Sequence, residues 1–349
     1  MGNQILKKMK TKLLLLPIGL VIGFLFLVTV TITTPGCAPD KPGDTTTAVT
    51  PPKAPRIPGP EFNADSAYAF TKAQVDFGPR VPGSPEHEKC AAWLKMKMES
   101  FGMTVTVQNS PATLYTGKTF TMSNIFSQYK PERTDRILLV AHWDSRHIAD
   151  RDPDTTYRNK PIDGASDGAS GVAVLLEIAR IITEKDPNIG VDFLMVDAED
   201  TGMPGGDENT WCLGSQYWSQ TVKPEYAKTV HFGILLDMVG GRGAIFPREG
   251  TSVRFAANAV EKVWSAAQNL GYGAYFVNSV TGETVDDNRF IIQNAGIPCI
   301  DIVHYDPAEQ DYGPYHHRHT DNMDIIDVAS LDAVGNVLVD VIYNEMPKK

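Results

Sequence analysis

Short apolar runs that alternate with segments of helical periodicity are the feature that most restricts the fold of this chain. Each run is rich in Val, Ile, Leu and Phe, which is typical of a strand buried on both faces. Between the runs, apolar residues recur at helical spacing, as in 171–184. This alternation predicts a single α/β domain with three αβα layers and a mostly parallel central sheet. The predicted buried strands are 136–141, the run that begins at Val191, 230–238 and 297–303.

The remaining elements follow from propensity and from Gly and Pro stop signals. The expected helices are 66–77, 85–101, 211–218, 253–270, 287–294 and 331–345, and further strands are expected at 104–107, 124–129 and 275–278. A polar loop, 144–166, separates two of these elements. Loops of this length in compact domains are usually functional.

Residues 1–37 predict an export signal. Four lysines within the first twelve residues precede 13–37, a segment without any charged side chain. The segment is compatible with a cleaved signal, with an uncleaved membrane anchor, or with a lipoprotein acylated at Cys37, which follows a glycine. We expect an exported protein, anchored to a membrane as a lipoprotein that faces the periplasm. A linker rich in Pro and Thr, 38–61, would then hold a catalytic domain, 62–349, away from that membrane.

Charge and cysteine content exclude several classes of protein. The formal net charge of -10 and the lack of a basic stripe argue against a nucleic-acid partner. No Cys-x-x-Cys motif occurs, so a cysteine-based zinc site is not expected. We expect Cys90 and Cys299 to be small core residues on a helix and a strand.

Acidic and imidazole side chains follow the predicted strands. In a parallel sheet, ligands bind beyond the carboxyl ends of the strands, so these side chains are expected to meet. Taken singly, each has a structural interpretation, such as a helix cap for a carboxylate. Their joint placement instead favours a catalytic Zn²⁺ site with nitrogen and oxygen ligands. The residues are His142, Asp144, Asp167, Glu199, Asp200, Asp237 and His319.

A competing motif lies at 164–168, where Gly-Ala-Ser-Asp-Gly matches the G-x-S-x-G pattern of serine hydrolases. That pattern requires a strand that leads directly into the serine. A polar loop containing Pro161 precedes it here, so we reject the serine-hydrolase interpretation.

The constellation resembles the M28 zinc peptidase family over about 142–322. The resemblance lies in His-x-Asp at His142, Asp167 in a turn of small residues, Glu199 with an acidic neighbour, Asp237, and His319. It implies a zinc exopeptidase-like fold. Within the family, segments 210–215, 235–240, 285–287 and 319–322 are similar to the glutaminyl cyclases, particularly the bacterial type that resembles the animal enzymes.

This likeness implies a glutaminyl-peptide cyclotransferase, an acyltransferase that converts the N-terminal Gln of peptides or proteins to pyroglutamate and releases ammonia. It implies that Asp167, Asp200 and His319 bind a single Zn²⁺, and that Glu199 transfers protons. Further residues expected near the substrate are the acids Asp237 and Asp286, with Trp211 and Asp287 as substrate contacts.

The chain also departs from the animal cyclases. Asp200 stands where they have Glu, and Arg318 stands where they have Trp before the metal histidine, so Trp211 is the candidate for one pocket wall. His142 is retained, which leaves open an aminopeptidase with two zinc ions. The pair Asp286 and Asp287 favours the cyclase, because it resembles acids of the cyclases and would not bind a metal ion in the peptidase. A non-catalytic binding module on the same fold is a third alternative.

Overall fold

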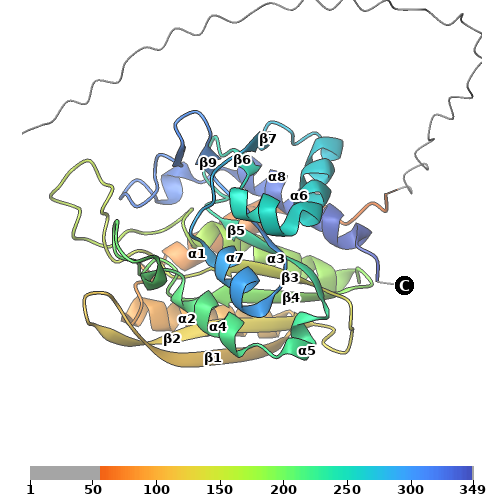
Figure 1. The fold of residues 1–349 in the computed structure, drawn as a ribbon, viewed down its shortest axis with the longest axis horizontal. Helices are drawn as coiled ribbons and strands as arrows, with labels where there is room; N and C mark the ends of the chain where they lie inside the picture. The colour runs from red at the N-terminus through yellow and green to blue at the C-terminus, as the bar shows by residue number, and fades with distance from the viewer. Residues whose placement is uncertain (1–55, 348–349) are drawn as a thin grey trace, which may run out of the picture. The chain divides into compact units, whose positions relative to one another are not determined.

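A six-stranded mixed sheet forms the centre of residues 56–347, which are the residues that the computed structural model of this protein describes (Figure 1). The strand order is β1-β2-β4-β3-β5-β8, in which β4, β3, β5 and β8 are parallel and β2 is antiparallel to both of its neighbours, β1 and β4. The strands are β1 (Thr104–Thr113), β2 (Thr119–Tyr129), β3 (Arg136–His142), β4 (Gly190–Val196), β5 (Val230–Asp237) and β8 (Cys299–Val303). The expectation of a mostly parallel sheet in an α/β domain is confirmed.

The sheet is apolar on both faces because side chains alternate along each strand. In β3, Ile137, Leu139 and Ala141 belong to the larger hydrophobic core, whereas Leu138 and Val140 belong to a second core on the opposite face. All five side chains are fully buried. This arrangement explains why the strand reads as a continuous apolar run rather than as an alternating one.

Helices cover both faces and complete the three layers (Figure 1). The larger core contains residues of α1 (Ala64–Val75), α2 (Pro85–Ser100), α3 (Ala169–Glu184), α6 (Gly250–Leu270) and α8 (Val328–Asn344). The second core is covered by α4 (Leu213–Thr221), α5 (Pro224–Ala227) and the segment that follows α7 (Asp287–Phe290).

Several elements differ from their predicted extent. The strands expected at 104–107 and 124–129 pair over ten positions as the β1–β2 hairpin, so both are longer. The helix expected at 287–294 divides into α7 and a π-helical turn, Ile291–Ala295. The strand expected at 275–278 is present as β7 (Phe276–Val280), and it pairs with β6 (Phe246–Arg248), which the sequence does not predict. A second short sheet that the sequence does not predict joins β9 (Tyr305–Asp306) to β10 (Asp311–Tyr312). Short 3₁₀ turns lie at Glu208–Thr210 and Met323–Ile325.

The predicted export signal, 1–37, and the linker up to residue 55 lie outside the described residues. Between residues 56 and 347, no helix is both long enough and apolar enough to cross a bilayer. Cys90 on α2 and Cys299 on β8 are buried, as predicted, and these two cysteines and the buried Cys212 are all free thiols.

Candidate active site

The carboxyl ends of the parallel strands bring three predicted site residues into contact. His142 is the last residue of β3 and Asp237 the last of β5, while Asp167 lies just before α3. The His142 Nε2 atom is 3.1 Å from Asp167 Oδ1 and 3.2 Å from Asp237 Oδ1. Burial lowers the pKa of His142, but contacts with carboxylates, among them Asp144, raise it well above its usual value.

The turn after β4 presents Glu199 and Asp200 in a fixed orientation. Asp144, which is fully buried, accepts hydrogen bonds from the backbone amides of Glu199 (3.1 Å) and Asp200 (3.2 Å). The preceding residue, Ala198, has a left-handed backbone with φ of 57°, which is uncommon for a residue other than glycine. This turn lets two adjacent carboxylates take different positions at the end of one strand.

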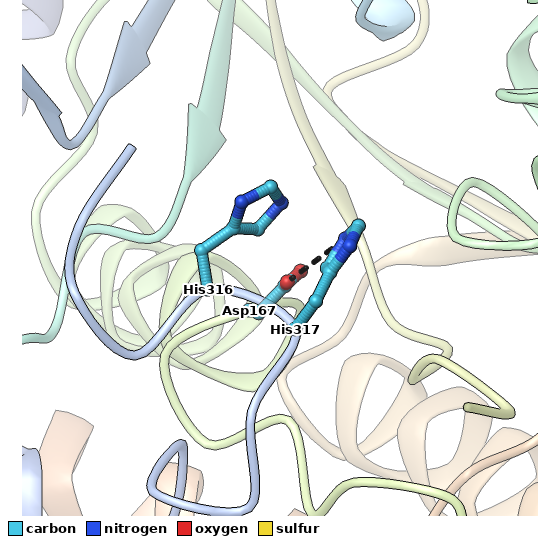
Figure 2. A group of neighbouring side chains, drawn as sticks. All are labelled: Asp167, His316 and His317. Atoms are coloured by element: carbon cyan, nitrogen blue, oxygen red, sulfur yellow. Dashed lines mark ion pairs between the residues drawn. The ribbon is translucent and has the colours of Figure 1, made fainter. Parts of the chain in front are cut away.

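Asp167, Asp200 and His317 form a buried group suited to a cation. His317 Nε2 lies 3.1 Å from Asp200 Oδ1 and 3.9 Å from Asp167 Oδ2. Figure 2 shows the Asp167 carboxylate pointing toward the His317 ring. The Oδ2 atoms of Asp167 and Asp200 are buried and have no hydrogen-bond partner. Buried carboxylate oxygens without partners are costly, and a bound Zn²⁺ would satisfy them, so these residues fit the expected metal.

His319 does not join this group, and the expectation that it would lie beside Asp167 and Asp200 is wrong. Asp152 accepts hydrogen bonds from the backbone amide of His319 (3.1 Å) and contacts its Nδ1 atom (3.2 Å), so the ring is held away on the loop. The His319 side chain is 31% exposed, whereas that of His317 is 6% exposed. One signal distinguishes the two in the sequence: an aromatic ring, His316, precedes His317, as a Trp precedes the metal histidine in the animal cyclases.

Neighbouring opposite charges stabilise the ionised forms of Asp200 and His317. Burial raises the pKa of Asp200, but the neighbouring His317 and Arg146 charges hold it well below its usual value. Burial lowers the pKa of His317, yet Asp200 and Asp150 raise it to about 9. Burial and the Asp200 charge raise the pKa of Asp167 to about 6. A cation bound here would favour the ionised form of Asp167.

Glu199 stands beside this group, next to a thiol and a second acid. The Cys212 Sγ atom donates a hydrogen bond to Glu199 Oε1 at 3.3 Å, a contact that the sequence did not predict. Glu199, Cys212 and Asp286 offer polar atoms within 4.8 Å of one another. Burial, followed by the Asp200 charge, raises the pKa of Glu199 well above its usual value. Burial and the Asp237 charge do the same for the pKa of Asp286.

A cavity of about 460 Å³ opens over these groups. Trp211 forms part of its wall and stacks on His317, with ring centroids 5.8 Å apart and planes inclined by 8°. The structure does not bring Asp287 to the cavity: its side chain is fully buried, and burial raises its pKa to about 7. The lining includes Asp167, Glu199, Asp200, Trp211, Asp237, Asp286, Tyr305, Tyr312, His316 and His317.

Comparison with known proteins gives consistent matches. The sequence profile of peptidase family M28 matches residues 124–342. A glutaminyl cyclase from Tannerella forsythia is 50% identical, with 82% of this chain and all of that chain covered and a TM-score of 0.80. A glutaminyl cyclase from Bacteroides thetaiotaomicron bound to N-acetylhistamine is 47% identical, with 82% of this chain and all of that chain covered and a TM-score of 0.80.

Proteins with a peptidase name match as well. A leucine aminopeptidase precursor from Bacteroides thetaiotaomicron is 46% identical, with 82% of this chain and 99% of that chain covered and a TM-score of 0.78. Aminopeptidase YwaD of Bacillus subtilis is 23% identical over 236 residues, which are 66% of this chain. The chain spans only 46% of the length of that curated relative.

Proposed function

Because this chain belongs to peptidase family M28, we propose that it is a glutaminyl-peptide cyclotransferase, acting on peptides or proteins with an N-terminal Gln. The observation that carries the proposal is that Glu199 and Asp286 lie close together in the cavity lining, beside the buried group formed by Asp167, Asp200 and His317. The likeness to two solved glutaminyl cyclases at 50% and 47% identity supports it.

Asp167, Asp200 and His317 would hold one Zn²⁺. Their two carboxylates and one imidazole leave room for a further ligand, as in catalytic zinc sites. When bound, zinc supplies Lewis acidity toward the side-chain carbonyl oxygen of the substrate glutamine.

Glu199 is the proton-transfer residue in this proposal. It takes a proton from the substrate α-amine as the nitrogen bonds to the side-chain carbonyl carbon. It returns a proton to the amide nitrogen, which leaves as ammonia when its bond to that carbon breaks. A raised pKa suits this double role, because the carboxyl group must both accept and donate a proton near neutral pH. The Cys212 thiol fixes one carboxyl oxygen of Glu199 by a hydrogen bond.

The neighbouring acids and Trp211 would orient the substrate. Asp286 and Asp237 both line the cavity and are placed to accept hydrogen bonds from the α-amine. Trp211 offers a flat apolar face against which the glutamine methylene groups can pack. Asp287 is fully buried outside the cavity lining, so it is not placed to contact the substrate.

An aminopeptidase with two zinc ions is the second candidate. His142, Asp167 and Asp237 offer ligand atoms within 4.8 Å of one another, so a second ion could share Asp167 with the first. The 46% identity to a leucine aminopeptidase precursor also favours this candidate. Under it, Glu199 would activate a water molecule rather than the substrate amine.

Paired assays on the purified protein separate the two candidates. We expect ammonia release from glutaminyl peptides, no hydrolysis of leucine anilides, and one zinc per chain by mass spectrometry. The Glu199→Gln variant is the control: it should keep its zinc and lose cyclisation by about 10²–10⁴-fold, the usual contribution of a general acid–base residue. Hydrolysis of leucine anilides with two zinc ions and no ammonia release from glutaminyl peptides would favour the peptidase instead.

We further propose that the protein is exported and held at a membrane as a lipoprotein facing the periplasm. The lysines and the uncharged segment of residues 1–37 support this proposal, with Cys37 as the acylated residue. Incorporation of labelled fatty acid into the wild type, and its loss in Cys37→Ser, would test the assignment.

A further inference from the structure

We propose that Arg146 is a positioning residue that couples the metal-binding group to the wall of the substrate pocket. The part of this proposal that concerns substrate binding rests on the proposed function, whereas the part that concerns the metal ligands does not. Arg146 lies in the loop after β3, is completely buried and is not part of the cavity lining. It therefore cannot touch the substrate, and any influence on the site must pass through the groups that it contacts.

The guanidinium group of Arg146 donates hydrogen bonds directly to the turn after β4 that carries Asp200. Its Nη1 atom donates to the backbone carbonyl of Asp200 at 3.0 Å and lies 3.5 Å from the Asp200 carboxylate. Its Nη2 atom donates to the carbonyl of Gly202 at 3.2 Å. Two points of this turn are thus fixed by one rigid planar group, which a flexible lysine ammonium could not reproduce.

A second contact reaches the metal-binding histidine. Arg146 Nε donates to Asp150 Oδ1 at 2.5 Å, and the same oxygen lies 3.3 Å from His317 Nδ1. The other ring nitrogen, Nε2, faces Asp200 and Asp167. Carboxylates that accept from the distal nitrogen of a metal-binding histidine fix its tautomer and ring orientation. Asp150 has that position here, and Arg146 holds Asp150.

A third contact reaches the pocket wall. The Arg146 guanidinium carbon lies 4.5 Å from the centroid of the Trp211 ring, within the range of a cation–π contact. Trp211 in turn stacks on the His317 ring. Arg146 therefore contacts Trp211 directly and is also linked, through Asp150, to the histidine on which Trp211 stacks. A change in the position of Arg146 would move the wall and the metal ligands together.

Arg136 provides a matched control. It is equally buried, binds the Asp192 carboxylate through two nitrogen atoms and donates to three backbone carbonyls. It begins β3, however, and so lies at the opposite end of that strand from Arg146. A lysine substitution there perturbs a buried arginine network without touching the site.

The experiment compares Arg146→Lys, Asp150→Asn and Arg136→Lys with the wild type. Zinc dissociation constants are measured by chelator competition in the absence of substrate, together with melting temperatures, kcat and KM for a glutaminyl peptide. We expect Arg146→Lys to raise the zinc dissociation constant about tenfold or more, as loss of outer-shell partners does, and to raise KM. We expect Asp150→Asn to weaken zinc binding, because the His317 ring loses the carboxylate that faces its Nδ1 atom.

Arg136→Lys should lower the melting temperature while leaving zinc affinity and KM near their wild-type values. The proposal is overturned if Arg146→Lys changes zinc affinity and KM no more than Arg136→Lys does. It is equally overturned if Asp150→Asn binds zinc as tightly as the wild type, an outcome that can be read even when Arg146→Lys does not fold. Because zinc affinity is measured without substrate, it tests the metal link whether or not the protein cyclises glutamine.

Discussion

The assignment of His317 rather than His319 as the metal-binding histidine gives a sharp prediction. Both residues lie on one loop and two positions apart, so His317→Ala and His319→Ala remove the same group from nearly the same segment. Only His317 contacts Asp200 and Asp167, whereas His319 contacts Asp152. We expect His317→Ala to lose tight zinc binding and His319→Ala to retain it.

The size of the effect follows from the number of ligands. Structural Zn²⁺ gains about 10–16 kcal/mol of binding free energy in zinc-finger peptides, where four side chains supply the ligands. An equal share is about 2.5–4 kcal/mol for each ligand, which corresponds to a rise of roughly 10²–10³-fold in the dissociation constant. In His319→Ala, the lost contact with Asp152 should cost about 1 kcal/mol of stability, without a measurable change in zinc affinity.

The assay is titration of the metal-free proteins with zinc against a chromophoric chelator, with circular dichroism to confirm that both variants fold. Removal of His317 should also abolish cyclisation at limiting zinc, whereas His319→Ala should turn over normally. Loss of zinc in His319→Ala combined with retention in His317→Ala would refute the reasoning.

Three further predictions concern the pocket and the buried acids. Asp286→Asn should lower kcat for glutaminyl peptides by about 10-fold or more without changing zinc content, as measured by steady-state kinetics and mass spectrometry. A Cβ atom at Gly202 would overlap the indole of Trp211, so Gly202→Ala should raise KM by about tenfold, the effect of losing 1–2 kcal/mol of apolar contact. Burial raises the pKa of Asp301 well above its usual value, so the folded protein retains a proton that the unfolded chain releases near pH 3.9. Stability should therefore decline as pH rises from about 4 toward the raised pKa. The melting temperature of Asp301→Asn should lack this decline, so its difference from the wild type should grow in the variant's favour over the same rise in pH.

The sheet and most of the site were predictable because each depends on a local pattern. Apolar runs define β3, β4 and β5, and the residues that follow them must meet at one edge of a parallel sheet. The contact between His142 and Asp237 follows from this rule alone, whereas Asp167 reaches His142 from the start of α3. The same rule places Glu199 and Asp200 at the end of β4.

The misassigned histidine shows where such local patterns cease to be informative. His317 and His319 occupy one loop without periodicity, and the choice between them depends on Asp152, which lies more than 160 residues earlier and binds His319. Arg146 and Asp150 were missed for a related reason. Apart from the contact between the two, their partners lie in other loops, and a polar loop does not indicate which of its charged residues turns inward.

The left-handed turn at Ala198 has a consequence for how the protein fails on heating. A residue other than glycine in that conformation costs about 1–3 kcal/mol, and only the surrounding contacts keep it there. Local loosening at the end of β4 would release the turn and redirect Glu199 while the rest of the sheet stays paired. On heating, activity should accordingly be lost before secondary structure, so that the protein is folded but inactive over a range of temperature.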